Sequence, residues 1–310
     1  MAAGSARWRD SAALGLRTVF TPTGLRGVAL ESAWVATHIA MYPMGLLGER
    51  ARDERDRFSL NGLPPMQRGL FTGDVEAAGT PILLVHGLVD NRSIFAVLRR
   101  TLRRRGFGRV CTMNYSVLTR DVRALARQLA ANVEELAADT GYERVHVIGH
   151  SFGGLIARYY VQRMGGDERV HTLVTLGTPH IGTAAARLLP HRLVRDLRPG
   201  SDVLNELAAP APGCRTRFVS VWSDLDQLMV PKRTARLDHP DLAARNLLVR
   251  GVGHLSLPAH GRVVHEVCAA LAHLETDGST RTPGITAIGP GRESRPTRRG
   301  LGRRGASAAR

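Results

Sequence analysis

One serine of this chain lies where a strand pattern meets a helix pattern. Ser151 is the third residue of Gly149-His-Ser-Phe-Gly153, between the β-branched run at 145–148 and an amphipathic run that follows Gly154. A G-x-S-x-G sequence in this context forms a sharp turn that lifts the serine hydroxyl above the edge of a sheet. The bare pattern is common by chance, so the flanking context decides. Ser151 is therefore the predicted nucleophile, with an ordinary structural serine as the alternative.

A serine hydroxyl needs a base to take its proton and a carboxylate to orient that base. His254 is the predicted base, because it ends the glycine loop Arg250-Gly-Val-Gly-His254 directly after an apolar strand pattern. The alternative for His254 is a capping or packing role. His150, beside the serine, we interpret as a packing residue.

Two aspartates compete for the role of the acid. Asp224 and Asp226 both lie in the loop that follows the strand pattern at 217–222. The apolar residues at 228–230 would let Asp226 turn inward, so the sequence favours Asp226. Asp224 is then expected to cap a turn or to hydrogen-bond the loop backbone.

Negative charge that develops on an attacked carbonyl is stabilised by backbone N–H groups. One predicted donor is the amide of Phe152, next after the serine. The other is the amide of Leu88, because Gly87 lets the chain turn tightly after the first core strand. We expect His86 to brace this loop rather than to transfer protons.

Strand and helix patterns alternate from about residue 79 to 274. Strands are predicted at 81–85, 110–113, 145–148, 170–176, 218–222 and 246–249, and helices at 93–105, 122–140 and 260–274. This alternation predicts an α/β fold with a mostly parallel, doubly wound sheet flanked by helices. Ligands of such sheets bind beyond the carboxyl ends of the strands, where every candidate above lies. The amphipathic segment at 184–197 predicts either a lid or an ordinary crossover helix.

Both ends of the chain differ from this core. Residues 1–60 are predicted to be an N-terminal apolar, helical segment, whose stretch 28–47 is interrupted by Glu31, His38 and Pro43. The interruptions favour an amphipathic helix, docked on the domain or on a membrane surface, over a transmembrane anchor. No signal-peptide pattern is found, so we expect a cytoplasmic protein or one at the inner membrane face. Residues 61–275 are the predicted catalytic domain, and 276–310 an arginine-rich disordered tail.

The positive charge is almost entirely arginine. Lys232 is the only lysine among 43 Lys and Arg residues, and the formal net charge is +16. We interpret the basic tail as solvated, because no helix-turn-helix, zinc-finger or RNA-binding motif accompanies it, and no nucleic-acid partner is expected. The sequence has neither H-E-x-x-H nor a Cys/His cluster, so no metal site is expected.

Four motifs together resemble the bacterial lipase/esterase branch of the α/β-hydrolases, over about residues 80–274: His86-Gly87, residues 149–154, Leu176-Gly-Thr-Pro-His180 and Gly251-Val-Gly-His254. The resemblance implies a triad of Ser151, Asp226 and His254, with the amides of Leu88 and Phe152 as oxyanion donors. It also implies ester hydrolysis through an acyl-enzyme, with no cofactor. The N-terminal segment, the arginine tail and the missing signal peptide depart from the family.

The predicted function is therefore hydrolysis of an apolar acyl or lipid ester. An acyltransferase, in which an alcohol replaces water, would use the same triad, so the sequence leaves it open. A non-catalytic, membrane-associated protein of the same fold is a rival from another class. It is disfavoured because such a protein need not retain serine, acid, base and both glycine loops. Acyl length, head group and oligomeric state do not follow from the sequence.

Overall fold

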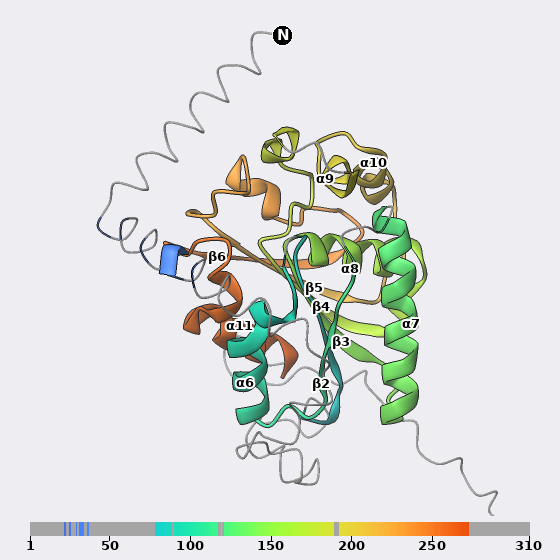
Figure 1. Cartoon of the computed structure of the whole chain (residues 1–310). Helices are drawn as coiled ribbons and strands as arrows, with labels where there is room; N and C mark the ends of the chain where they lie inside the picture. The colour runs from blue at the N-terminus through green and yellow to red at the C-terminus, as the bar shows by residue number, and fades with distance from the viewer. Residues whose placement is uncertain are drawn as a thin grey trace, which may run out of the picture.

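The computed structural model describes residues 78–188 and 192–272, except 89, 117, 118 and 120, and near the N-terminus residues 22, 25, 29, 31–33 and 36. Six parallel strands form one sheet in the order β2-β1-β3-β4-β5-β6 (Figure 1). The strands are β1 (Ile82–Val85), β2 (Val110–Met113), β3 (Val145–His150), β4 (Val170–Leu176), β5 (Arg217–Ser223) and β6 (Ala243–Val249). The predicted parallel α/β fold is confirmed.

Helices cover both faces of this sheet. In β1, Leu83 and Val85 join the apolar cluster of α7 (Val122–Thr140) and α8 (Phe152–Arg163), whereas Ile82 and Leu84 join that of α6 (Ala96–Arg104) and α11 (Gly261–Leu271). Successive side chains of a strand point to opposite faces, so a strand covered on both sides must be apolar throughout. Figure 1 shows α6 and α11 on one side of the sheet and α7 on the other.

Local signals set the bounds of α7. The Asp121 side chain accepts a hydrogen bond from the Ala124 amide at 2.8 Å, and Gly141 ends the helix in the left-handed conformation with φ 72°. Both are standard helix-terminating devices, and the bounds agree with the prediction. β6 is longer than predicted, because Ala243, Ala244 and Arg245 pair with β5 although their side chains do not favour strands.

The order of the strands places the candidate residues. β2 and β3 lie on opposite sides of β1, so the chain direction across the sheet reverses there. A crevice at the carboxyl ends of the strands is expected at such a switch point. The loop of Gly87 leaves β1 and Ser151 leaves β3 at this point, while the loops of Asp226 and His254 leave β5 and β6 along the same edge.

The amphipathic segment predicted at 184–197 forms short helices. They are the 3-10 turn η4 (Ala184–Arg187) and α9 (Arg192–Asp196), and α10 (Asp202–Ala208) follows. Leu193 and Val194 are buried in the cluster of α7 and α8, whereas Leu188 is 82% exposed. Part of the segment is thus packed against the core, and one apolar side chain faces outward.

Most of the two predicted terminal segments, 1–60 and 276–310, lies outside the described residues, so the division into domains stays a prediction. Within 28–47 the described residues Ala29, Glu31, Ser32, Ala33 and Ala36 are helical. None of the helices in the described part of the chain has the length and apolar character needed to cross a membrane.

Close packing requires the glycines between β3 and α8. A Cβ on Gly149 would overlap the backbone of Gly154, and a Cβ on Gly153 would overlap the carbonyl oxygens of Val85 and His86. A side chain can relieve an overlap by changing its rotamer, but backbone atoms of the strands and the helix cannot. The turn that carries Ser151 therefore depends on the absence of side chains at these positions.

We expect Gly153→Ala to lower the free energy of unfolding by at least about 3 kcal/mol, the upper end of the usual cost of overpacking. Gly261→Ala is the matched control, because a Cβ there meets no atom within 4 Å. Alanine at this helical position should be neutral or stabilising by up to about 1 kcal/mol. Urea unfolding of both variants checks the difference, and equal midpoints would contradict the steric argument.

Candidate active site

Ser151 has an unusual backbone conformation. Its φ of 54° and ψ of −121° make it the one non-glycine residue with positive φ in the part of the chain that is described. Three hydrogen bonds hold its peptide groups: Ser151 N donates to Leu176 O (2.8 Å), while Gly154 N and Thr178 Oγ1 donate to Ser151 O (3.1 and 2.9 Å). The predicted strand–turn–helix is thus present, and β4 and its loop support it from one side.

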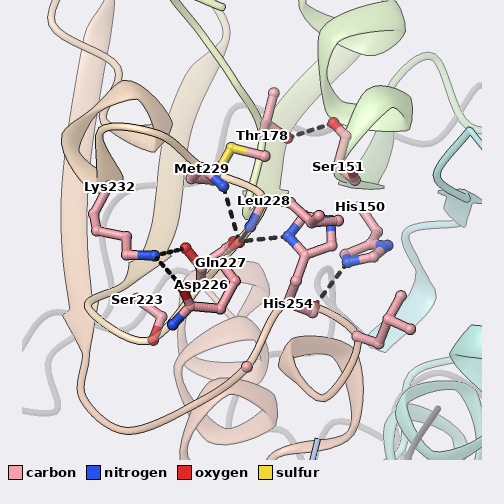
Figure 2. Close-up of polar contacts among 12 residues, drawn as sticks. His150, Ser151, Thr178, Ser223, Asp226, Gln227, Leu228, Met229, Lys232 and His254 are labelled. Atoms are coloured by element: carbon pink, nitrogen blue, oxygen red, sulfur yellow. Dashed lines mark hydrogen bonds and ion pairs between the residues drawn. The ribbon is translucent and has the colours of Figure 1, made fainter. Parts of the chain in front are cut away.

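His254 and Asp226 form a buried pair. His254 Nδ1 lies 2.7 Å from Asp226 Oδ2, and Asp226 Oδ1 accepts hydrogen bonds from the amides of Leu228 (3.0 Å) and Met229 (3.2 Å) (Figure 2). An ionised carboxylate only accepts hydrogen bonds, so Nδ1 carries a hydrogen, and in the neutral ring Nε2 then has the lone pair. This is the tautomer in which an imidazole can take a proton through Nε2.

The electrostatic surroundings favour protonation of His254. Burial is the largest single effect and would by itself lower the pKa, but the surrounding carboxylates, Asp226 foremost through its charge and its hydrogen bond, together outweigh it. The more distant charges of Asp90 and Glu31 act in the same direction. The pKa of His254 is therefore raised above its ordinary value, which makes the ring a stronger base.

Asp224 has a different position from Asp226. Its Oδ1 accepts a hydrogen bond from the Gly251 amide at 2.8 Å, so it links the loops that follow β5 and β6. Met229 is buried as the prediction supposed, but Leu228 is 49% exposed. Of the apolar residues at 228–230, only Met229 is buried where Asp226 turns inward.

Ser151 and His254 lie in one cluster. A Cβ built on Gly177 would lie 2.9 Å from Asp226 Oδ2 and 3.1 Å from His254 Nδ1. Gly177 directly follows Leu176, whose carbonyl oxygen accepts the hydrogen bond of the Ser151 amide. The ring of His150, next to Ser151, has its centroid 4.8 Å from that of His254. Among the described residues no hydrogen bond joins Ser151 Oγ to His254. Such bonds are commonly long without substrate and shorten in the reacting complex.

The loop after β1 lies against the serine. A Cβ on Gly87 would be 3.3 Å from the Ser151 Cβ, which places the following residue, Leu88, beside the turn. The Tyr115 hydroxyl faces the carbonyl oxygens of His86 (2.9 Å) and Gly87 (2.8 Å), and its ring stacks on that of His86 with centroids 4.3 Å apart. His86 and Tyr115 therefore brace the loop together. Phe152 begins α8, where the first amides have no partner within the helix.

A contact between a histidine and a carboxylate beside the serine was missed by the sequence analysis. His150 Nδ1 lies 3.3 Å from Asp90 Oδ2, and both side chains are buried or nearly so. His150 Nε2 lies 3.1 Å from the carbonyl oxygen of His254, which can only accept. Nε2 therefore carries a hydrogen.

Two other residues were also missed. Tyr115 follows β2 closely, so the rule that sites form at the carboxyl ends of strands was a signal that could have found it. The Glu31 carboxylate accepts hydrogen bonds from the loop after His254. No local signal in the sequence points to that contact, because 224 residues separate Glu31 from Leu255.

Exposed apolar side chains lie on the loops that follow β4 and β5. Ile181 (57% exposed) and Leu188 follow β4, and Leu228 follows β5. The two loops are joined, because Thr183 Oγ1 donates to Leu228 O and accepts from the Val230 amide. The loops after β4 and β5 are therefore linked to each other, and each carries at least one exposed apolar side chain.

Part of the chain is similar in sequence to known hydrolases. A family model described as palmitoyl protein thioesterase matches residues 81–212, a region that includes Ser151 but ends before Asp226 and His254. A triacylglycerol lipase of Pseudarthrobacter phenanthrenivorans is 33% identical over 124 residues, which are 37% of this chain and 38% of that protein. One of Vibrio cholerae is 33% identical over 133 residues, 41% of this chain and 40% of that protein. The chain thus matches well under half of the length of these relatives.

The crystal structure of the mature Bacillus licheniformis lipase BlEst2 has the same fold. It superposes with a TM-score of 0.53 at 17% identity and covers 63% of this chain and 92% of that one. The resemblance predicted from the motifs is confirmed: part of the chain is similar in sequence to palmitoyl protein thioesterases and triacylglycerol lipases, and its fold is that of the lipase BlEst2.

Asp226→Asn should lower the pKa of His254, because burial would then act without the carboxylate that opposes it. NMR titration of the His254 ring in the Ser151→Ala background measures this directly. Asp224→Asn is the control: it removes the same charge from the same loop, but Asp224 hydrogen-bonds Gly251 instead. An equal drop in both variants would contradict the assignment of Asp226 as the partner of His254.

Proposed function

We propose that this chain hydrolyses carboxylic esters of apolar acyl groups through a covalent acyl-enzyme formed on Ser151. The observation that carries the proposal is the buried Asp226–His254 pair, 2.7 Å across, in one cluster with a serine on a strained turn between strand and helix. The resemblance to lipases and the shared fold support the same reaction.

In the first half of the reaction Ser151 Oγ bonds to the ester carbonyl carbon while His254 Nε2 takes the hydroxyl proton. Asp226 stabilises the resulting imidazolium and keeps Nδ1 as the donor. The amides of Leu88 and Phe152 donate to the oxyanion. The bond to the alcohol oxygen then breaks, and the leaving alcohol takes the proton from Nε2. The acyl group stays on Ser151.

In the second half water repeats the attack. His254 Nε2 takes a proton from the water as its oxygen bonds to the acyl carbon. The same two amides hold the second oxyanion, and collapse returns the proton to Ser151 Oγ as the carboxylic acid leaves. No electrons are exchanged with another group, so the cycle is complete with these residues and water.

The exposed apolar side chains of Ile181, Leu188 and Leu228 favour an acyl chain as the substrate group. Because apolar surface gains free energy when it leaves water, these side chains would contact the chain of a lipid-like ester. The match to palmitoyl protein thioesterases adds thioesters as a second class of substrate, since the same triad attacks either carbonyl. An acyltransferase remains the alternative in which an alcohol replaces water.

Ser151→Ala should lower turnover of p-nitrophenyl esters by on the order of 10⁴-fold, because the nucleophile of the covalent step is lost. Ser32→Ala is the control, because Ser32 is exposed, and this variant should be fully active. A panel of oxygen esters, thioesters and competing alcohols compared by product analysis distinguishes hydrolase, thioesterase and acyltransferase. Turnover that survives in Ser151→Ala would reject the nucleophile.

Leu228→Ser should reduce kcat/KM for long acyl chains by about tenfold while changing that for acetate esters little. The estimate follows from about 1.5 kcal/mol for a half-exposed leucine that the bound acyl chain covers. The backbone amide that binds Asp226 is kept in this variant. Val97→Ser is the control, because Val97 is exposed on α6, a helix that carries none of the candidate site residues. A loss that is equal for short and long chains would contradict an acyl contact.

A further inference from the structure

Glu31 connects the N-terminal segment to the loop of the candidate base. Its Oε1 accepts a hydrogen bond from the Leu255 amide at 2.7 Å, and its Oε2 accepts from the Ser256 amide at 3.0 Å and the Ser256 hydroxyl at 2.5 Å. Both amides belong to the two residues that directly follow His254. The carboxylate therefore binds the chain at the point where it leaves the base.

The loop has a shape that admits this carboxylate. A Cβ on Gly253 would overlap the Cγ, Cδ and Oε2 atoms of Glu31, so glycine at this position is what lets the side chain approach. Two backbone N–H groups and one hydroxyl converge on one carboxylate, and hydrogen bonds to a charged acceptor are about twice as strong as neutral ones. The contact is thus specific in geometry as well as in charge.

We propose that Glu31 is a positioning residue for His254, and that the N-terminal segment thereby completes the active site. The proposal rests on the proposed function in so far as His254 is the base. Glu31 lies outside residues 81–212, the region that matches the thioesterase family model. The proposed role of Glu31 is therefore not part of what that match covers. Glu31 acts through the backbone of Leu255 and Ser256, and does not need to touch the substrate.

Several charged groups surround His254, and Glu31 is one of them. Asp226 on the loop after β5 makes the direct contact, His150 packs on the ring from β3, and Asp90 lies on the loop after β1. The Glu31 charge raises the pKa of His254, in the same direction as Asp90 and with less effect than Asp226. Removal of this charge should therefore move the pKa of His254 downward.

The test is Glu31→Gln in the full chain. Glutamine keeps the size of the side chain, but it has one acceptor oxygen and turns an NH2 group toward backbone donors. We expect kcat for p-nitrophenyl esters to fall about tenfold, the effect of one charge-assisted hydrogen bond, with little change in KM. The acidic limb of kcat/KM should move to lower pH. Glu135→Gln on α7 is the matched control, since Glu135 is exposed and the charge change is identical.

A second measurement does not depend on activity. In the Ser151→Ala background, NMR amide exchange of Leu255 and Ser256 should speed up at least tenfold in Glu31→Gln and stay unchanged in Glu135→Gln. Loss of a purely structural contact would speed exchange but would not move the titration of the His254 ring. An active wild type with unchanged exchange and an unchanged pH profile in Glu31→Gln would overturn the proposal. A wild type without esterase or thioesterase activity would overturn the proposed function alone, because exchange and titration still test the contact.

If Glu31→Gln does not fold, Ser256→Ala replaces it. This variant removes one donor and leaves both backbone contacts, so exchange of the two amides should rise by a smaller factor. Unchanged exchange and an unchanged His254 titration in Ser256→Ala would then overturn the proposal.

Discussion

The strained backbone of Ser151 is the constraint around which the rest of the site is arranged. A non-glycine residue with positive φ costs roughly 1–3 kcal/mol and persists only when its surroundings hold it. Here the surroundings are β4, through the Leu176 carbonyl oxygen, the loop of Thr178, and the first turn of α8. The conformation also brings the backbone of Gly153 against the end of β1. The turn is therefore a junction of three neighbouring strands as well as the support of one hydroxyl.

Burial of charge imposes the second constraint. Asp226 is fully buried, and a carboxylate in such a place must be paired or hydrogen-bonded. Two loop amides and the His254 ring satisfy it. Asp90 is a second carboxylate close to the serine, and its negative charge would oppose an oxyanion. His150 Nδ1 lies 3.3 Å from Asp90 Oδ2, so the histidine beside the nucleophile contacts this carboxylate as well as the ring of His254.

Features that depend on local sequence were predictable. The bounds of α7 follow from Asp121 and Gly141, and the position of Ser151 from the glycines around it, because caps and tight turns are encoded by a few adjacent residues. The preference for Asp226 over Asp224 as the partner of His254 also agrees with the geometry, since a buried neighbour pulls one of them inward. Its catalytic role stays a prediction.

Contacts between distant segments were not predictable in the same way. Tyr115 reaches the loop of Gly87 because β2 and β1 are neighbours, and Asp90 reaches His150 because β1 and β3 are. The periodicity of a sequence gives the type of an element but not which side chains of two loops will meet. Glu31 is the extreme case: as part of a helical pattern it interrupts an apolar stretch, and only the folded chain reveals its hydrogen-bonding partners.

The raised pKa of His254 affects stability and activity in opposite ways. The folded state gains from the protonated ring, whereas the proposed catalysis needs the neutral ring. A group whose pKa is higher in the folded than in the unfolded chain stabilises the fold when it is protonated. That contribution is complete below the unfolded pKa and is lost as the pH rises through the folded one. Catalysis by the proposed mechanism needs the neutral ring, which predominates only above the folded pKa. Each carboxylate that favours the imidazolium, Asp226 most and Glu31 least, therefore stabilises the charged intermediate but also moves the onset of activity to higher pH. At the pH at which the site is active, protonation of His254 therefore no longer stabilises the fold. Hydrogen bonds to the loop backbone must then hold His254 in place.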